Sequence, residues 1–509
     1  RKRRFHGRSI KWRDIMKKEI ILSLVALFAL CSCKKDNGET KKTYTFDSTK
    51  EATYEVADTY PISLRQIKGA EKWNPMISVG NPKMLVIPVD FSDSTCDILP
   101  KGCEGTRSDI QAAFFGTEQD TVIEGQDPDG WESVKSYYYE SSYGKLTIDG
   151  VVTPWYRASR TAEAYTAMST SAASSILLEA VSWYKQYCEE NELPFDFDAD
   201  QDGYIDCVQM IYSVSDRYGG SETWWAYTSA LRGSIANLES PEPYQYVFAS
   251  QSFMYHDTHY IDAHTYIHET GHVLGLEDYY NTSDNPVLSR PNPAGKVDMM
   301  DNNVGDHCAY SKFAMQWITP KIVTGEGSIT IRPMTTTGDA IIVSPQWNGT
   351  AFDEYLIIEY HRPIGLNQKD SQRQYAGAYP LVMTDNGIKV YHIDSRLLYV
   401  DAMSYEPIEY TTTFKQDAFN TTILAHSNTP DNSGEYDNRL VHLLESSGKN
   451  TFFNGGTATN ETLFKEGDTF GAKEGLFDTF EFHSGKELPF VFEITSITDE
   501  EAVITFAAK

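Results

Sequence analysis

Positive charge is scarce in this chain. Its 509 residues hold 44 Lys and Arg against 72 Asp and Glu, a net charge of −28 at pH 7. The first 32 residues hold nine of the basic residues and two of the acidic ones, so the remainder carries about −35. A chain this acidic cannot easily assemble a basic groove, so we expect no nucleic acid among its partners. Aromatic residues are plentiful at 13%, which excludes a disordered acidic tail.

Long apolar runs are also lacking near the start of the chain. The run over residues 20–31 is too short to span a bilayer, and Met16-Lys17-Lys18 opens it in the manner of a secretory signal. The sequence has no initial methionine, so we interpret residues 1–15 as an upstream over-read and residues 16–32 as a lipoprotein signal peptide. Leu30-Cys31-Ser32-Cys33 resembles a bacterial lipobox, which predicts lipidation of Cys33. A plain cleaved signal peptide is the alternative.

Cysteine is sparse, and its spacing does not resemble a zinc knuckle. With Cys31 and Cys33 set aside, an odd number remains, namely Cys96, Cys103, Cys188, Cys207 and Cys308. Cys96 and Cys103 share a loop that contains proline and glycine. The sequence leaves two alternatives for them, a local disulfide or two free buried thiols.

The rest of the chain divides into three predicted parts. Residues 33–80 are polar and predict a tether with a short propeptide. Residues 81–320 alternate strands with helices, which indicates an α/β (α+β) domain. Its expected strands are 85–91, 146–152 and 205–214, and its expected helices are 170–190 and 260–274. Residues 321–509 predict an all-β, sandwich-like domain with strands at 328–332, 340–343, 355–360, 388–392, 490–494 and 502–506.

His268, Glu269 and His272 carry the strongest chemical signal. They form an HExxH motif, in which two histidines four apart project from one helix face and can reach one metal ion. The glutamate beside the first histidine is placed to act as a general base on a water at the metal. An ordinary amphipathic helix with surface histidines is the weaker alternative.

The third metal ligand is expected to be Asp278. A thermolysin-type site needs a glutamate on a later helix, but after Glu277 the next glutamate is Glu326. Gly275 favours a left-handed end to the helix, after which the chain can double back and present Asp278. The weaker candidates are Glu277, Asp298 and Asp301. His264, one turn upstream on the same face, is expected to be a buried supporting histidine and not a ligand.

HExxHxxGxxD followed by Val297-Asp298-Met299-Met300 resembles the metzincin metalloproteases, and more closely the M6 or immune inhibitor A peptidases. Weaker matches lie on both sides of this motif and occur in the family's order, at residues 82–91, 133–146, 305–318 and 387–394. The resemblance implies a metzincin-like fold, zinc as cofactor, and Met300 in a methionine turn below the metal. No cysteine lies in residues 34–80, so inhibition by a cysteine on the zinc is unsupported.

An acidic loop predicts a second metal site. Its candidate calcium ligands are Asp198, Asp200, Asp202, Tyr204 and Asp206. The alternating carboxylates and the glycine at the sixth position resemble a calcium loop, but Gln209 stands where an EF-hand has its glutamate. Calcium is also what the M6 resemblance implies, and an acidic turn closed by its own hydrogen bonds is the alternative.

These features predict a zinc endopeptidase in which Glu269 is the general base. His307 and Tyr310 are candidates for assisting the oxyanion. We expect a monomer that acts on proteins or peptides and is lipid-anchored in the cell envelope, at the outer membrane or cell surface. The alternative is a surface adhesin that binds a glycan or protein and has a secondary or inactive zinc site.

Overall fold

The computed structural model describes residues 43–509, except for 127–129, 169–170, 221, 284–290, 373–374, 376–378, 380 and 430–437. The predicted signal segment and Cys33 lie outside the described residues. Within the described part, no helix is both long and apolar enough to cross a membrane.

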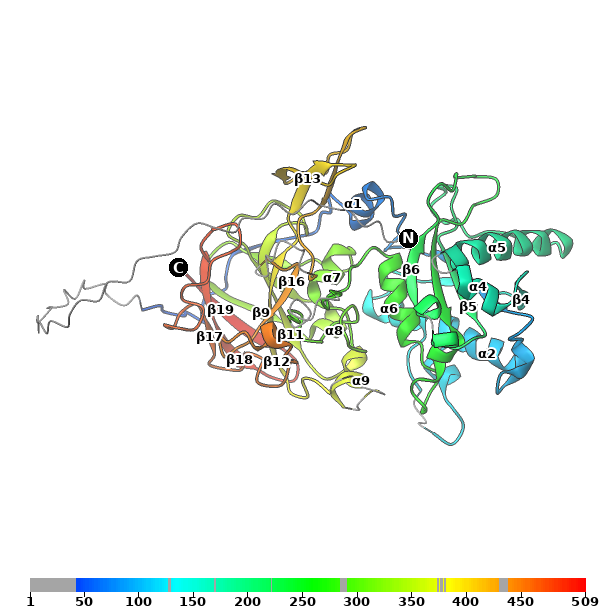
Figure 1. Ribbon diagram of the computed structural model, residues 1–509. Helices are drawn as coiled ribbons and strands as arrows, with labels where there is room; N and C mark the ends of the chain where they lie inside the picture. Colours follow the sequence, from blue (N-terminus) through cyan, green and yellow to red (C-terminus); the bar gives the residue numbers. More distant parts are fainter. Residues whose placement is uncertain are drawn as a thin grey trace, which may run out of the picture. The chain divides into compact units, whose positions relative to one another are not determined.

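A mostly parallel sheet organises the first half of the chain (Figure 1). Its strand order is β3-β2-β5-β7-β6, and β4 also pairs with β2. Neighbouring strands are parallel except for the edge strand β6, which is antiparallel to β7. The strands are β2 (Lys83–Asp90), β3 (Asp149–Val152), β4 (Tyr156–Arg157), β5 (Cys207–Tyr212), β6 (Tyr227–Ala230) and β7 (Gln245–Ser250).

Helices cover both faces of this sheet, which explains why β2 reads as an unbroken apolar run. Successive side chains of a strand point to opposite faces. Leu85 and Ile87 therefore pack in one core with α4 (Ala162–Met168) and α5 (Ala172–Glu190). Met84 and Val86 pack in the opposite core, whose helices are α2 (Gly102–Phe115), α3 (Val134–Ser141) and α6 (His264–Val273).

The predicted elements are present, but several begin later than expected. The helix expected over 170–190 is α5, and its predicted apolar face is buried. The helix expected from residue 260 begins at His264 because Tyr260 forms a β-bridge with Val122. The strand expected from residue 146 begins at Asp149, since Leu146 makes only an isolated bridge with Gly80.

The second half of the chain is rich in β-structure and forms three sheets. The sheet orders are β1-β8-β10-β11-β12-β16, β17-β18-β19-β9 and β14-β13-β15. Their strands are β1 (Tyr54–Val56), β8 (Lys321–Val323), β9 (Gly327–Ile331), β10 (Ala340–Val343), β11 (Glu354–His361), β12 (Gly387–Asp394), β13 (Leu397–Asp401), β14 (Pro407–Thr411), β15 (Asn420–Leu424), β16 (Val441–Leu444), β17 (Thr469–Phe470), β18 (Phe490–Ile497) and β19 (Ala502–Ala508). The short helices of this half are α7 (Ala309–Ala314), α8 (Met334–Thr337) and α9 (Gln368–Ser371), while β1 and the helix α1 (Leu64–Ala70) come from the N-terminal segment.

The two faces of the six-stranded sheet in this half pack in two different hydrophobic cores. Ile341 and Ile358 pack in one core with Val491 and Ile504 of the four-stranded sheet. Ile342 and Ile357 point the other way, into the core that also contains α6. The buried core therefore continues across residue 320, where the sequence predicts a domain boundary.

Part of the predicted tether takes part in the fold. β1 pairs antiparallel with β8, and α1 is capped at Ser63 by a capping box with Gln66. The sequence indicated neither element, because β1 is exposed and α1 has only seven residues.

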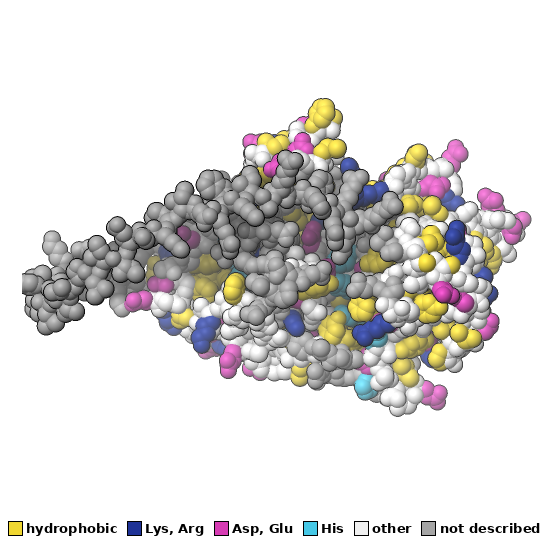
Figure 2. All heavy atoms as spheres, in the orientation of Figure 1, with side chains coloured by type: hydrophobic (Ala, Val, Ile, Leu, Met, Phe, Trp, Pro, Cys, Tyr) yellow, Lys and Arg dark blue, Asp and Glu magenta, His cyan; other side chains and the backbone are white. Residues whose placement is uncertain are grey.

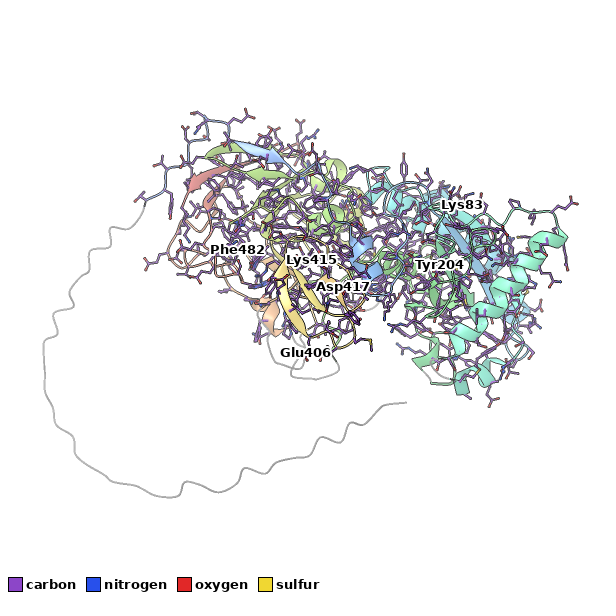
Figure 3. The ribbon with its side chains drawn as sticks, turned by 90° about the horizontal axis from the view of Figure 1, so that it is seen from above. Lys83, Tyr204, Glu406, Lys415, Asp417 and Phe482 are labelled. Atoms are coloured by element: carbon purple, nitrogen blue, oxygen red, sulfur yellow. A yellow bond between two sulfur atoms is a disulfide. The ribbon has the colours of Figure 1, made fainter. Side chains whose placement is uncertain are left out.

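The three-stranded sheet was not predicted either. Every residue of β14 is exposed or only partly buried, so the strand lacks the apolar alternation on which strand prediction relies. Figure 3 labels Lys415 and Asp417 in the connection between β14 and β15, and Glu406 just before β14. Acidic and basic side chains are scattered among uncharged ones on the face drawn in Figure 2.

Candidate metal centre and active site

Helix α6 presents His268 and His272 on one face and ends at a glycine. The ring centroids of the two histidines are 4.9 Å apart. Gly275 has a φ of +101°. Its N–H donates to His272 O (2.9 Å), and Leu276 N–H donates to Gly271 O (3.0 Å). These two bonds form a Schellman motif, which turns the chain back toward the histidines.

We expect Gly275→Ala to lower the free energy of unfolding by about 1–2 kcal/mol, because only glycine adopts this φ without strain. A Cβ at this position would also lie 3.2 Å from Leu64 Cγ and 3.3 Å from Lys68 Cγ. Urea unfolding measures the change. Gly69→Ala is the matched control, since no atom lies within 4 Å of its Cβ position inside α1. An unchanged midpoint for Gly275→Ala would contradict the assigned turn.

The turn brings Asp278 to the two histidines. Asp278 Oδ1 lies 3.2 Å from His268 Nε2 and 3.2 Å from His272 Nε2. Ligands of a tetrahedral zinc, each about 2.0–2.1 Å from the ion, lie about 3.3 Å from one another. The spacing of these atoms therefore suits a single zinc ion.

The hydrogen bonds around the histidines also fit a metal. His268 Nδ1 lies 2.8 Å from Met299 O, and His272 Nδ1 lies 2.9 Å from Leu276 O. A carbonyl accepts only from N–H, so the proton of each neutral ring is held on Nδ1 and the lone pair on Nε2 faces the site. Asp278 Oδ1 is buried and has no hydrogen bond of good geometry to the described residues. Two Nε2 atoms that face one carboxylate oxygen suit a metal ion, and without one a proton on an imidazole takes its place, as the raised pKa of His272 indicates.

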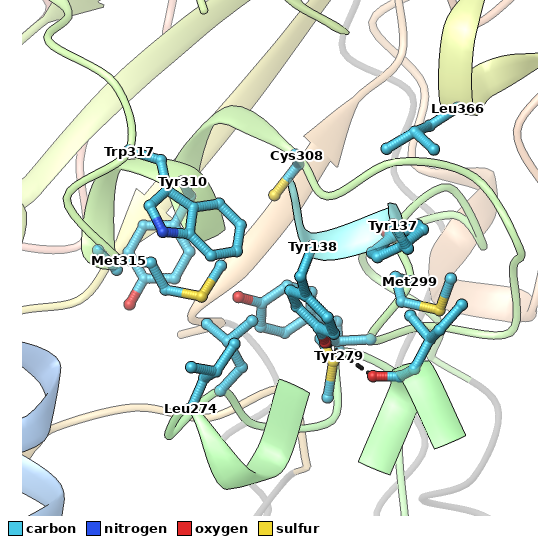
Figure 4. Close-up of a cluster of buried hydrophobic side chains, with 14 of the residues drawn as sticks. Tyr137, Tyr138, Leu274, Tyr279, Met299, Cys308, Tyr310, Met315, Trp317 and Leu366 are labelled. Carbon is cyan, nitrogen blue, oxygen red and sulfur yellow. Dashed lines mark hydrogen bonds between the residues drawn. The ribbon is translucent and has the colours of Figure 1, made fainter. Parts of the chain in front are cut away.

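The methionine segment lies against the metal-binding helix. A Cβ on Gly271 would be 2.3 Å from Met300 Sδ, so glycine is needed there for helix and methionine to pack. Met300 O accepts from Tyr279 N–H (2.7 Å), next to Asp278. Figure 4 shows Tyr138, Tyr279 and Met299 in the buried cluster beside the helix; the Tyr138 hydroxyl donates to Ile267 O (2.7 Å). The methionine segment thus packs against the helix that carries the two histidines and also bonds the residue that follows Asp278.

Glu269 lies in the same cavity as the three ligands. The cavity has a volume of about 580 Å³, and Trp225, Tyr227 and Thr228 also line it. The Thr228 hydroxyl, on the edge strand β6, lies 2.8 Å from Glu269 Oε2 and 3.0 Å from Glu269 O. The side chain of Glu269 is thereby fixed beside the metal site.

Comparison with known families assigns this region. Residues 76–290 match the model of the catalytic domain of the M6 peptidases, the immune inhibitor A family. This part of the chain is an M6 metallopeptidase domain. The match includes the parallel sheet, α6 and Asp278, and it ends before Met300. No curated protein matches the chain.

The other ligand candidates have different partners. Glu277 forms an ion pair with Lys68, which also pairs with Glu71 at 3.1 Å. Asp298 accepts from Met300 N–H (2.7 Å) and Cys308 N–H (2.6 Å). Asp301 accepts from the backbone N–H of Lys296 and of Asn302, both at 2.7 Å. The structure thus groups only Asp278 of these carboxylates with the two histidines.

His264 is buried one turn before His268, and its Nε2 lies 2.8 Å from Asn303 O. Burial lowers its pKa to about 3, so the ring is neutral. His264 lines the cavity but is absent from the three-residue ligand group.

His307 and Tyr310 do not line the active-site cavity. The His307 side chain has no exposed surface, and its Nδ1 lies 3.4 Å from Asp298 Oδ1. Tyr310 is buried and packs near Tyr279, with ring centroids 6.4 Å apart. Both side chains belong to the packing below the methionine turn, so the geometry corrects the expectation that they reach an oxyanion.

Three residues of the cavity, Thr228, Tyr280 and Tyr379, were not predicted from the sequence. The Tyr280 ring stacks near His268, with centroids 6.2 Å apart. Burial and the charge of Asp278 raise the pKa of Tyr280 well above its ordinary value, so its phenol stays protonated. Burial raises the pKa of Tyr379 to about 12. Tyr280 could have been noticed two residues after Asp278, whereas no local pattern connects Thr228 or Tyr379 with the motif.

We expect Thr228→Val to lower kcat about tenfold while zinc content stays unchanged, because Glu269 loses the hydrogen bond that positions its carboxylate. Thr228→Ser should restore most of the activity, since it keeps the hydroxyl. Ser229→Ala on the same strand is the control, because successive side chains point to opposite faces. A wild-type kcat in Thr228→Val would show that Thr228 does not position Glu269.

The acidic loop gathers three of its predicted calcium ligands. Carboxylate oxygens of Asp198, Asp200 and Asp206 lie within 4.8 Å of one another. Asp202 is not in this group, and its Oδ2 accepts from Arg65 Nη2 and Asn74 Nδ2, both at 2.9 Å.

Two features of the loop compete with a cation. Arg65 also forms an ion pair with Asp200. The Tyr204 hydroxyl donates to Ser234 O (3.1 Å), and Asp206 Oδ2 accepts from Lys83 N–H (2.8 Å). Figure 3 labels Lys83 and Tyr204 in this part of the molecule.

The cysteines resolve the alternatives left by the sequence. Cys96 and Cys103 form a disulfide, with Cα atoms 4.7 Å apart. Cys188, Cys207 and Cys308 are free and buried.

Proposed function

We propose that the protein is an extracytoplasmic zinc endopeptidase. The observation that carries this proposal is the convergence of His268, His272 and Asp278 beside Glu269 in one cavity of an M6 metallopeptidase domain. Zinc suits this set, because two imidazoles and one carboxylate are typical protein ligands of catalytic zinc.

The chain's own residues divide the chemistry among them. His268 Nε2, His272 Nε2 and Asp278 would hold the ion, which supplies Lewis acidity to a water and to the scissile carbonyl. Glu269 Oε2 is held by Thr228, so Oε1 is the atom free to take the proton of the attacking water. Glu269 then passes that proton to the departing amine.

The oxyanion needs a donor other than His307 or Tyr310. Tyr280 and Tyr379 both line the cavity, and both phenols are protonated at neutral pH because burial raises their pKa. We propose that their hydroxyls donate to the developing negative charge.

Cleavage of a peptide library, mapped by mass spectrometry with and without a zinc chelator, tests the proposal. We expect internal cleavage that the chelator abolishes and added zinc restores. Cleavage that resists the chelator would contradict a metal-dependent endopeptidase. An uncleaved library together with tight glycan or protein binding would instead favour the adhesin.

Export and lipid anchoring are part of the proposal. The disulfide between Cys96 and Cys103 supports an oxidising compartment, because cytosolic thiols are kept reduced. We propose that Cys33 carries the lipid. Cys33→Ala should release the protein from the membrane fraction and remove a lipid-sized mass from its N-terminal peptide; an unchanged fraction and mass would contradict this.

We also propose that the acidic loop binds calcium through Asp198, Asp200 and Asp206, with Arg65 displaced. Calcium should then raise the unfolding midpoint, and Asp198→Asn should remove that rise. Asp196→Asn is the control, since Asp196 pairs with Lys83 outside the group. If calcium leaves the wild-type midpoint unchanged, the loop is an acidic turn closed by Arg65.

A further inference from the structure

A second cluster of metal-ligating side chains lies in the β-rich half, apart from the M6 site. Glu354 begins β11 and is directly opposite Asp394, the last residue of β12. Both carboxylates are buried, with 2% and 0% of their surface exposed. Like charges directly opposite each other in a sheet are destabilising, and more so when buried. Glu354 accepts from the backbone N–H groups of His483 and Ser484, but these neutral donors leave the charge of the pair at −2.

Histidines from one strand and two loops surround these carboxylates. His392 of β12 places Nε2 2.9 Å from Glu354 Oε1. His483 places Nδ1 2.8 Å from Asp394 Oδ2 and 3.9 Å from Glu354 Oε1. Figure 3 labels Phe482, which immediately precedes His483. His426 adds a third imidazole, with Nε2 3.3 Å from Asp394 Oδ2.

The spacing of these atoms suits a transition-metal ion. One ligand atom from each of Glu354, His392 and His483 lies within 4.8 Å of the others. The separations from Glu354 Oε1, 2.9 Å to His392 Nε2 and 3.9 Å to His483 Nδ1, bracket the value of about 3.3 Å for neighbouring ligands of a tetrahedral zinc. Mixed imidazole and carboxylate ligands favour zinc over calcium, which prefers oxygen alone.

The charged side chains of the cluster also carry a net negative charge, which a cation would offset. Arg396 forms two hydrogen bonds with Asp394, Nε to Oδ1 and Nη2 to Oδ2, both at 2.7 Å. One guanidinium against two carboxylates leaves one negative charge when the histidines are neutral. A divalent ion would offset this charge and would hold β11, β12 and the segment around His483 together.

The cluster can be reached from solvent. Glu354, Arg396 and Ser484 line a cavity of about 250 Å³, which gives an ion a route to the ligands.

We propose that Glu354, His392 and His483 form a second zinc site that is structural, with the carboxylate of Asp394 beside it. None of the three ligands lines the catalytic cavity, so no peptide chemistry is assigned to the site.

Zinc content per chain tests the proposal. The full chain is equilibrated with zinc, freed of unbound metal by gel filtration and analysed by mass spectrometry. We expect two zinc ions in wild type, one in H268A/H272A, one in H392A/H483A and none in the variant with all four changes. H256A/H259A changes two histidines outside both clusters and should keep two ions.

H268A/H272A leaves the second cluster intact, so its zinc content decides the proposal even if H392A/H483A fails to fold. Added zinc should also raise the unfolding midpoint of H268A/H272A. No zinc in H268A/H272A would overturn the proposal and show that the cluster is held by hydrogen bonds and ion pairs alone. One zinc in the four-change variant would overturn it too, because the ion would lie elsewhere. If wild type held one zinc ion and H392A/H483A held none, the catalytic site would bind no zinc. That result would contradict the proposed function but not this second site.

Discussion

Glu269→Gln is expected to lower kcat/KM by about 10²–10⁴-fold while the protein stays folded and keeps its zinc. Glutamine has nearly the same shape, and its carbonyl can still accept the hydrogen bond from Thr228 that the carboxylate accepts at 2.8 Å. It cannot take a proton from the attacking water. The change therefore removes the general base and leaves the metal ligands untouched.

The measurement combines peptide cleavage with zinc content per chain. Glu239→Gln is the matched control, because it makes the same chemical change at an exposed residue that does not line the catalytic cavity. Cleavage at the wild-type rate by Glu269→Gln would show that another group accepts the proton. Loss of zinc from Glu269→Gln would show that Glu269 is needed for metal binding.

The grouping of His268, His272 and Asp278 could be predicted because its geometry is local. His268 and His272 share a helix face by virtue of their spacing, and a left-handed glycine at Gly275 turns Asp278 toward them. Each step depends on residues within a few positions of the next. The supporting contacts of Met299 and Met300 come from residues 21 and 22 positions after Asp278.

The residues that surround the ligands could not be predicted in this way. His307 and Tyr310 follow the methionine turn closely, yet they point into the core below it. Thr228 reaches Glu269 only because β6 reverses direction at the edge of a parallel sheet. Spacing along the chain does not reveal which side of a loop faces a cavity.

The fold shows the same distinction. Buried strands such as β2 and β10 are largely apolar and were found from the sequence, whereas the exposed strand β14 was not. The cluster around Glu354 was also missed, because its residues lie as far apart as Glu354 and His483 and meet only through strand pairing. Nonlocal contacts of this kind require the three-dimensional structure.

Asp278→Asn is expected to weaken zinc binding by more than about 100-fold and to abolish most peptide cleavage. Loss of a group that only supports a ligand already costs about 10–100-fold in metal affinity, so loss of a ligand should cost more. The amide is neutral and keeps only one weak oxygen donor. It no longer supplies the negative charge that lies 3.2 Å from both imidazole Nε2 atoms.

Glu277→Gln distinguishes Asp278 from its neighbour. Glu277 points to Lys68, and Lys68 still has Glu71 at 3.1 Å when that pair is broken. We therefore expect Glu277→Gln to keep its zinc and most of its activity. Competition with a chromogenic chelator measures both affinities, and circular dichroism checks that each variant is folded. The opposite pattern, with tight zinc binding in Asp278→Asn and weak binding in Glu277→Gln, would move the third ligand to Glu277. It would also require the segment after Gly275 to adopt another conformation when zinc is bound.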